Sequence, residues 1–412
     1  MDTMTNQEWL ERLESTLPLG SSCGSKAAQL VPQEPAVIVR ADGCRAWDAD
    51  GRDYVDFKNA LGPVTLGYRY PAVDEAIRAQ LDKGILFSAP APLEAEVSEM
   101  LCEVIPCAEQ AAFLKTGGEA CAAVIRLARA YTGRDHVIQI GYNGWINTLG
   151  HGARILPSMD TVAGANLPGV PASLSDLHHI AAWNDEKAIS DLFDEFHGKI
   201  AAIIVAMDYA NPEAGETFYP FLRQITQKNG ALLIFDEIVT GFRVALGGVQ
   251  EYFGVTPDLA VFAKGIANGM PLSVYAGRKD IMKMLARGGG VVVSSTCAGD
   301  ALSLAACKAV IHAYREHNVI QHMWDHGSYM WDKVNGLFGK YAYSLELKGF
   351  PCCKFFSPTA DAKGGEKNAF FRACFGNGVS LYNTSYINFS HQYADLDEAL
   401  GRMENALIQL TQ

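Results

Sequence analysis

The feature that most constrains the fold of this chain is a series of short apolar runs that alternate with helix-like segments between residues 111 and 277. The runs are AAFLK (111–115), HVIQI (136–140), AAIIVA (201–206), ALLIF (231–235), LAVFA (259–263) and LSVYAG (272–277). Most positions of each run are apolar, rather than every second position, which is typical of parallel strands covered on both faces. The segments between them, such as the helix expected from about residue 218, would supply that cover. The sequence therefore predicts a large α/β domain.

The segments on either side of this region predict a second, smaller domain. Residues 37–57 hold short alternating runs split by Asp42-Gly43 and Asp50-Gly51, which are typical β-hairpin turns. After about residue 310 the sequence indicates a helix, three strand-like segments and a C-terminal amphipathic helix. We expect a large domain over residues 50–305 and a small α+β domain over 306–412, which the segment 1–49 joins.

The overall charge and the N-terminal sequence exclude several classes of partner. The formal net charge of −12 leaves no basic surface for nucleic acid. The N-terminal sequence MDTMTNQEWLERLES is charged, and the longest strongly apolar run, residues 200–207, is far shorter than the roughly 20 residues of a membrane span. Ten cysteines without C-x-x-C spacing indicate free thiols. A cytoplasmic enzyme of small molecules is therefore expected, without a membrane or nucleic-acid partner.

Three stretches place chemistry-bearing residues directly after predicted strands. In KTGGEA, Gly117 and Gly118 turn the chain into a helix whose first N–H groups can bind a phosphate. In LIFDE a carboxylate, Asp236, ends a buried strand, and in VFAKG an amine, Lys264, ends another. A lysine among apolar residues loses its proton more easily and can then form a Schiff base. Taken singly, each stretch also has a purely structural interpretation: a tight turn for the first, a helix cap for the second and a surface lysine for the third.

Taken together, the three stretches point to one cofactor. A phosphate anchor, a partner for the pyridinium nitrogen and a Schiff-base lysine are what pyridoxal 5′-phosphate (PLP) requires. With GYNGW (141–145) and SSTCAGDALSLAA (294–306), the motifs also follow the order of a known family. The whole chain resembles the class III, fold-type I PLP-dependent aminotransferases, in the branch that includes glutamate-1-semialdehyde aminomutase. The resemblance implies a mainly parallel, seven-stranded sheet between helices.

The resemblance also implies roles for single residues. Lys264 would hold PLP as a Schiff base and would then move a proton between the substrate carbon and the cofactor. Asp236 would pair with the pyridinium nitrogen and keep it protonated.

The remaining cofactor contacts implied by the resemblance surround the ring and the phosphate. Gly117 and Gly118 would offer backbone N–H groups to the phosphate, and Tyr142 would stack on the ring. Thr296 would reach the phosphate of the partner subunit, which implies a homodimer with shared active sites.

The sequence departs from the family pattern at several positions. Gly118 stands where a serine or threonine is usual, and Asn143 replaces the histidine of a usual Tyr-His-Gly. Ala206-Met207 replaces a Glu-Pro pair. Lys26 is the nearest basic residue to the place of an arginine that the aminomutase uses for its substrate carboxylate, and lysine cannot form the same fork. Lys26, Asn143 and Trp145 are the candidate substrate contacts.

Three functions follow as hypotheses. The first is an aminotransferase that moves an amino group from a donor to a ketone or aldehyde, such as a keto sugar, a keto acid or a biosynthetic intermediate, in a ping-pong cycle. The alternative is an intramolecular aminomutase of the glutamate-1-semialdehyde type, against which the absence of the arginine argues. The third is a non-catalytic protein that keeps only the fold, and the joint presence of Lys264, Asp236 and Tyr142 speaks against it.

Two further features stay open at the level of sequence. His322 and His326 are spaced to share a helix face, where they could bind a metal or simply face solvent, and no metal is expected. Residues 155–185 are rich in Pro, Gly, Ser and Ala and are long enough for a functional loop.

Overall fold

A computed structural model describes residues 4–145 and 169–412 of the chain. The chain divides into two compact units: unit 1 is Met1–Pro71 with Gln321–Gln412, and unit 2 is Ala72–Ile320. Of the possible functional loop at 155–185, residues 155–168 lie outside the described part. Within the described ranges, no helix is both long enough and apolar enough to cross a membrane.

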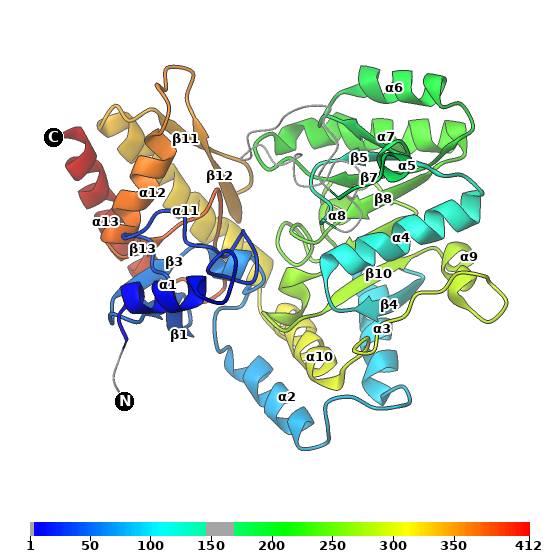
Figure 1. Cartoon of the computed structure of the whole chain (residues 1–412), viewed down its shortest axis with the longest axis horizontal. Coiled ribbons are helices and arrows are strands. Elements are labelled where there is room, and N and C mark those ends of the chain that lie inside the picture. Colours follow the sequence, from blue (N-terminus) through cyan, green and yellow to red (C-terminus); the bar gives the residue numbers. More distant parts are fainter. Residues whose placement is uncertain (1–3, 146–168) are drawn as a thin grey trace. The chain divides into compact units, whose positions relative to one another are not determined.

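Unit 2 is built on a seven-stranded sheet, as the resemblance implies (Figure 1). Its strands, in the order in which they lie side by side, are β4 (Gln110–Leu114), β10 (Ser273–Gly277), β9 (Leu259–Phe262), β8 (Leu232–Asp236), β7 (Ile200–Ala206), β5 (His136–Ile140) and β6 (His178–Ala181). Only β10 runs antiparallel to its neighbours, so the prediction of a mainly parallel sheet is confirmed. β10 is as fully buried as the central parallel strands, and its apolar sequence therefore gave no sign of its direction.

The apolar pattern does not predict β6, because this edge strand is short and contains two histidines, His178 and His179. It lies within the stretch 155–185, whose composition indicates a possible functional loop. β6 pairs in parallel with β5, which places it at the edge of the sheet opposite β4.

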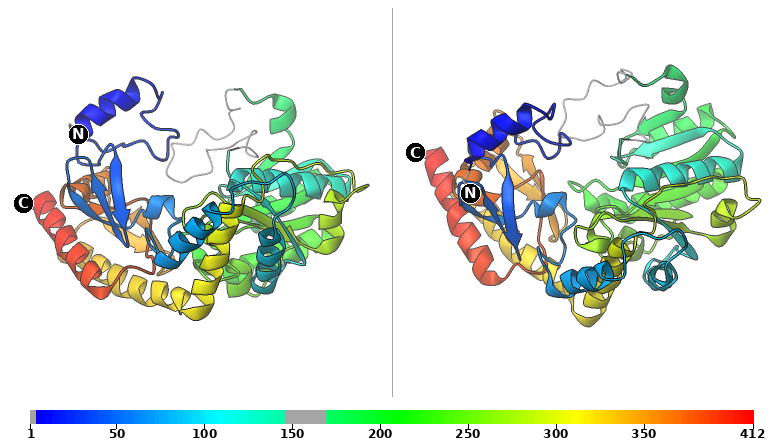
Figure 2. Two further views of the ribbon diagram at one scale, coloured as in Figure 1. Left: turned by 90° about the horizontal axis from the view of Figure 1, so that it is seen from below. Right: turned by 60° about the horizontal axis from the view of Figure 1, so that its bottom comes forward.

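Helices cover both faces of this sheet (Figures 1 and 2). The helices of unit 2 are α2 (Pro71–Leu81), α3 (Pro92–Val104), α4 (Gly117–Thr132), α5 (Ala172–Ser175), α6 (Glu186–Glu195), α7 (Gly215–Asn229), α8 (Val249–Tyr252), α9 (Lys279–Met282) and α10 (Ala301–Glu316). Short 3-10 turns are η3 (Pro212–Ala214), η4 (Lys264–Ala267) and η5 (Lys283–Leu285). The buried face of α4 packs on alternate residues of the strands, such as Ile234 and Val261. Tyr219 of α7 packs on Phe235, on the opposite face.

Unit 1 combines the two ends of the chain. Its elements are α1 (Asn6–Glu14), β1 (Ile38–Asp42), β2 (Arg45–Asp48), β3 (Asp53–Asp56), η1 (Asn59–Leu61), α11 (Val319–Lys340), β11 (Leu345–Lys348), β12 (Cys353–Pro358), α12 (Glu366–Gly376), β13 (Val379–Ser380), β14 (Thr384–Tyr386) and α13 (Tyr393–Thr411). The strands β1, β2 and β3 form the antiparallel meander that the turn sequences predict. β13 extends this meander by parallel pairing with β3, and β11, β12 and β14 form a separate three-stranded sheet.

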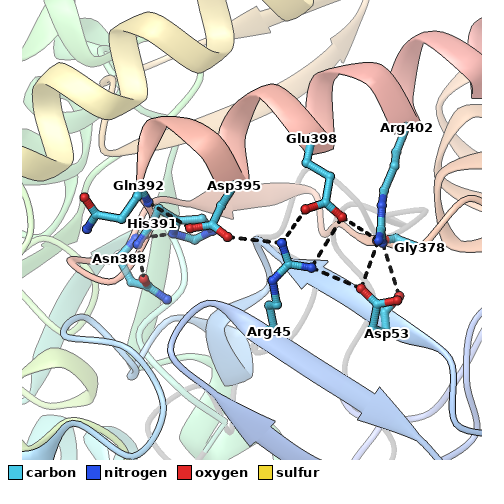
Figure 3. Close-up of polar contacts among 9 residues, drawn as sticks. All are labelled: Arg45, Asp53, Gly378, Asn388, His391, Gln392, Asp395, Glu398 and Arg402. Carbon is cyan, nitrogen blue, oxygen red and sulfur yellow. Dashed lines mark hydrogen bonds and ion pairs between the residues drawn. The ribbon is translucent and has the colours of Figure 1, made fainter.

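An ion-pair network joins the meander to the C-terminal helix α13 (Figure 3). Arg45 of β2 lies 3.1 Å from Asp53 and 3.1 Å from Asp395, and it also pairs with Glu398. Arg402 of α13 lies 2.9 Å from Asp53 and 2.6 Å from Glu398. These groups are half-buried, so the network is screened less than a surface ion pair.

The predicted domain boundaries differ from the division in the structure. A boundary at residue 50 would separate β2 from β3, although these strands pair with each other. A boundary at 305 would cut through α10, which belongs to unit 2 down to its last turn. Both boundaries depend on contacts between distant parts of the sequence, which local patterns do not reveal.

Candidate functional site

Four predicted motifs lie at one edge of the unit 2 sheet. The strands β4, β5, β8 and β9 run in the same direction, so their carboxyl ends meet at this edge. The glycine turn at Gly117 follows β4, Tyr142 follows β5, Asp236 ends β8 and Lys264 follows β9. This is the edge at which open α/β sheets bind their ligands.

The carboxylate of Asp236 is buried and held by three hydrogen-bond donors. Its Oδ2 accepts from Asn143 Nδ2 at 3.0 Å and from Cys121 Sγ at 3.7 Å, and its Oδ1 accepts from the backbone N–H of Ile238 at 3.0 Å. Burial raises the pKa of Asp236, while the bonds from Asn143 and Ile238 and the nearby Lys264 act in the opposite direction. The result is a fixed carboxylate beneath the edge of the sheet.

The amine of Lys264 lies within electrostatic reach of this carboxylate. Lys264 is half-buried and begins the turn η4 with a left-handed φ of 44°. Such a conformation is strained for a residue with a side chain and is often found at functional sites. Burial lowers the pKa of Lys264 to about 8; Asp236 opposes this shift, and the Arg243 cation adds to it. At pH 7 about a tenth of the amine is therefore uncharged and nucleophilic.

The glycine turn at the start of α4 offers backbone donors at the same edge. Thr116 caps the helix, because its Oγ1 accepts from the N–H of Glu119 at 3.3 Å, while Glu119 accepts in return from the N–H of Thr116 at 2.8 Å. Among the described residues, no group accepts from the N–H groups of Gly117 and Gly118. A phosphate would be favoured here by both these donors and the helix dipole.

Close backbone packing fixes this turn. A Cβ on Gly117 would lie 2.4 Å from Ile238 Cδ1, and a Cβ on Gly144 would lie 3.0 Å from the Cα of Gly118. The GYNGW turn thus packs directly on the start of α4, which brings two of the predicted motifs into contact.

The other candidate residues differ in their placement. Tyr142 and Trp145 are exposed at the sheet edge, and Thr296 is exposed in the loop before α10. Lys26 is exposed in unit 1. Asn143 was expected to face the substrate, but the structure gives it another partner: its side chain is wholly buried and its amide bonds to Asp236, because the residue points under the edge of the sheet.

Sequence reasoning missed two residues of this site. Cys121 and Arg243 lie beside Asp236 and Lys264, respectively, and neither was a candidate. The position of Cys121, one helical turn after Gly117, was the available signal, because that residue of α4 must face the ends of the strands.

The two adjacent carboxylates after β8 have different roles in the structure. Glu237 points away from Asp236 and is fully buried, and its Oε2 and Oε1 accept from the backbone N–H groups of Val249 at 2.9 Å and Gln250 at 3.0 Å. Thr240 also donates to it. Glu237 therefore holds the start of α8, and burial raises its pKa to about 7.

The histidine pair lies in unit 1 and is not a solvated helix face. The rings of His322 and His326 stack with centroids 3.6 Å apart. His322 Nε2 lies 2.9 Å from the carbonyl oxygen of His391, and His326 Nδ1 lies 3.0 Å from that of His322. Over residues 4–145 and 169–412, no group of three or more His, Cys, Asp or Glu side chains could hold a metal ion.

A fold-type I sheet with a buried carboxylate, a lysine of lowered pKa and a glycine turn at one edge defines a PLP-dependent enzyme class, and comparison with known proteins agrees. The family described as "Aminotransferase class-III" matches residues 27–407. The chain belongs to this PLP-dependent family.

Among curated relatives, the chain is 34% identical to glutamate-1-semialdehyde 2,1-aminomutase 2 of Lachnoclostridium phytofermentans, over 98% of this chain and 99% of the relative. It is 33% identical to glutamate-1-semialdehyde 2,1-aminomutase of Syntrophobacter fumaroxidans, over 96% and 95% of the two chains.

Solved structures show the same fold. The PLP internal aldimine form of the FumI protein of Sphingopyxis sp. MTA144 matches with a TM-score of 0.87 and 25% identity, over 98% of this chain and 96% of that one. A transaminase with PLP bound matches with a TM-score of 0.88 and 22% identity, over 99% of both chains. The fold class predicted from the sequence is thereby confirmed.

Proposed function

We propose that this enzyme moves an amino group from one carbon to another, with Lys264 as the Schiff-base lysine and Asp236 as the partner of the PLP ring nitrogen. The observation that carries the proposal is the joint placement of these two groups at the ends of neighbouring strands, with the lysine pKa lowered to about 8. PLP supplies the electron sink for the carbanion chemistry. Asp236 keeps the ring nitrogen charged, and the amine of Lys264 carries the substrate proton.

The rest of the cofactor site follows from the same edge of the sheet. The N–H groups of Gly117 and Gly118 bind the phosphate, and Tyr142 covers one face of the ring. The donor set fits PLP without a side-chain hydroxyl at position 118, because the helix start already offers two donors.

The curated relatives favour an amino shift within one substrate of the glutamate-1-semialdehyde type. Relatives of that name match at 33–34% identity over nearly the full length of both chains. The second candidate is an aminotransferase with separate donor and acceptor, and specific residues favour it: Lys26 and Ala206-Met207 depart from the substrate side of the family pattern. The sequence alone favours the aminotransferase, so the relatives reverse the order of the two candidates.

One turnover experiment separates the two candidates. Purified PLP-loaded enzyme is given glutamate 1-semialdehyde alone, and the isomer with its amino group on carbon 1 is measured against time. The aminomutase is expected to convert many equivalents per active site without a second carbonyl compound. An aminotransferase would instead release the deaminated dicarbonyl compound, with the aldehyde of a second substrate molecule or an added carbonyl compound as its acceptor, and would not accumulate the isomer. No consumption of this substrate, with turnover of another amino donor and acceptor, would exclude the first candidate.

We further propose that the active enzyme is a homodimer in which Thr296 serves the partner's phosphate site. Thr296 lies in an exposed loop of unit 2 that also exposes Val292. Close by, Ile85 accepts from the N–H of Ala301 at 2.8 Å, and the side chains of residues 85–87 are exposed and apolar. Exposed apolar side chains near Thr296 support an interface at this place.

Subunit complementation tests this assignment. Lys264→Ala and Thr296→Asp each inactivate the homodimer, the second by placing a negative charge against the phosphate. If Thr296 acts across the interface, co-expressed mixed dimers have one intact site and recover roughly half of wild-type activity per dimer. If mixed dimers stay inactive while both variants still dimerise in analytical ultracentrifugation, Thr296 does not act in trans.

A further inference from the structure

Two buried side chains outside the predicted cofactor contacts, Asn143 and Cys121, anchor Asp236. Asn143 Nδ2 and Cys121 Sγ both donate to the same oxygen, Oδ2. Both side chains are wholly buried, one in the turn after β5 and the other in α4. Oδ1 accepts only the N–H of Ile238 among the described residues, and this leaves one of its acceptor directions open.

We propose that Asn143 and Cys121 are positioning residues that fix Asp236 by its Oδ2 and so leave Oδ1 to meet the ring nitrogen of PLP. This inference rests on the role of Asp236 in the proposed function. The amide and the thiol act as a pair because they converge on one oxygen from two different elements. Removal of either lets the carboxylate rotate away from the direction in which it binds.

Both donors are neutral, which sets this site apart from one with the histidine of the usual Tyr-His-Gly. An asparagine cannot titrate, and burial together with the nearby Asp236 raises the pKa of the Cys121 thiol well above its usual value. The other ionisable groups that act on Asp236 are Lys264 and, from α7, the buried Tyr219. The support of Asp236 by its two neutral donors is therefore independent of pH over the range in which an imidazole titrates.

The Asn143 Oδ1 atom is consistent with this assignment. It is buried and has no hydrogen-bond partner among the described residues, so only the Nδ2 end of this amide is used. A buried amide oxygen without a partner costs stability, and the bond from Nδ2 to Asp236 offsets part of that cost.

The test measures binding of PLP itself, with no substrate. PLP is removed from wild type and variants, and its dissociation constant is measured by titration of the visible absorption band. We expect Asn143→Ala to weaken PLP binding about tenfold, as for loss of a hydrogen bond to a charged group. Cys121→Ala is expected to weaken PLP binding about threefold, because a thiol is a weak donor. Cys121→Ser is expected to restore the affinity for PLP.

Cys307→Ala is the matched control. Cys307 is equally buried in a helix of unit 2, but only burial affects its thiol. Its loss is expected to lower thermal stability without changing the affinity for PLP. Asn143 and Cys121 donate to the same oxygen. The loss of PLP-binding free energy in the double variant should therefore be smaller than the sum of the losses in the two single variants.

A charge variant sharpens the test. Asn143→Asp keeps the size of the side chain but places a second carboxylate against Asp236, and two such groups share one proton. Its affinity for PLP should be poor at pH 8 and should recover as the pH falls and the new carboxyl becomes a donor. In Asn143→His the affinity for PLP should change with pH around 6.5, the usual imidazole pKa, whereas the affinity of the wild type should not.

The outcomes separate this inference from the proposed function. If Asp236→Ala loses PLP affinity but Asn143→Ala and Cys121→Ala keep wild-type affinity and absorption, the inference is wrong while the role of Asp236 stands. If Asp236→Ala itself binds PLP as the wild type does, the proposed role of Asp236 fails. A fall in thermal stability alone would mark both residues as packing residues and overturn the inference.

Discussion

Replacement of Lys264 by alanine is expected to lower turnover by at least about 1000-fold, because the variant loses both the covalent anchor and the proton carrier. The protein should still fold, since residue 264 begins a short 3-10 turn and a smaller side chain leaves that turn intact. Activity is measured with PLP in excess. Borohydride reduction followed by mass spectrometry of the peptide around residue 264 shows whether the cofactor is attached there.

Lys279→Ala is the control for this substitution, since Lys279 is an exposed lysine of α9 in the same unit. It should keep both activity and the labelled peptide. Attachment of PLP to a different lysine in the wild type would contradict the assignment.

The pH dependence of attachment adds an independent test. Burial lowers the pKa of Lys264 to about 8, so the fraction of uncharged amine rises about tenfold per pH unit below this value and levels off above it. The rate at which the apo protein attaches PLP should follow the same curve. A rate that still rises steeply at pH 10 would mean that Lys264 titrates like a free lysine.

The main sheet could be predicted from the sequence because buried parallel strands are apolar at every position. This pattern located β5, β7, β8 and β9 to within a residue or two. It could not assign the direction of β10, because burial on both faces produces the same composition in a parallel and an antiparallel strand. It also missed β6, whose place at the edge permits polar residues.

The site could be predicted only in part, for a related reason. Residues that directly follow parallel strands must meet at one edge, and this brings Asp236 and Lys264 together without further information. The contacts of Asn143 and Cys121 are different, because they depend on side-chain directions across β7 and along α4. Strand ends are local features of a sequence, whereas a bond between two distant turns is not.

The two neighbouring carboxylates after β8 provide the sharpest mutational contrast. Asp236→Ala is expected to reduce turnover by about 1000-fold, because the charge that stabilises the cofactor ring is lost from a buried site. Glu237→Ala is expected to keep near wild-type turnover per folded molecule, because Glu237 bonds to the start of α8 rather than to the groups around Lys264.

Measuring the stability of both variants separates a loss of chemistry from a loss of folded protein. Each substitution removes a buried carboxylate that accepts several hydrogen bonds, so each should lower the free energy of unfolding by about 1–3 kcal/mol. Urea denaturation gives this quantity for both variants, and turnover is then compared at equal folded fractions. Similar stability with very different turnover assigns the chemistry to Asp236 alone. Equal losses of turnover would show instead that the whole end of β8 acts as one structural unit, and the separate role proposed for Asp236 would fail.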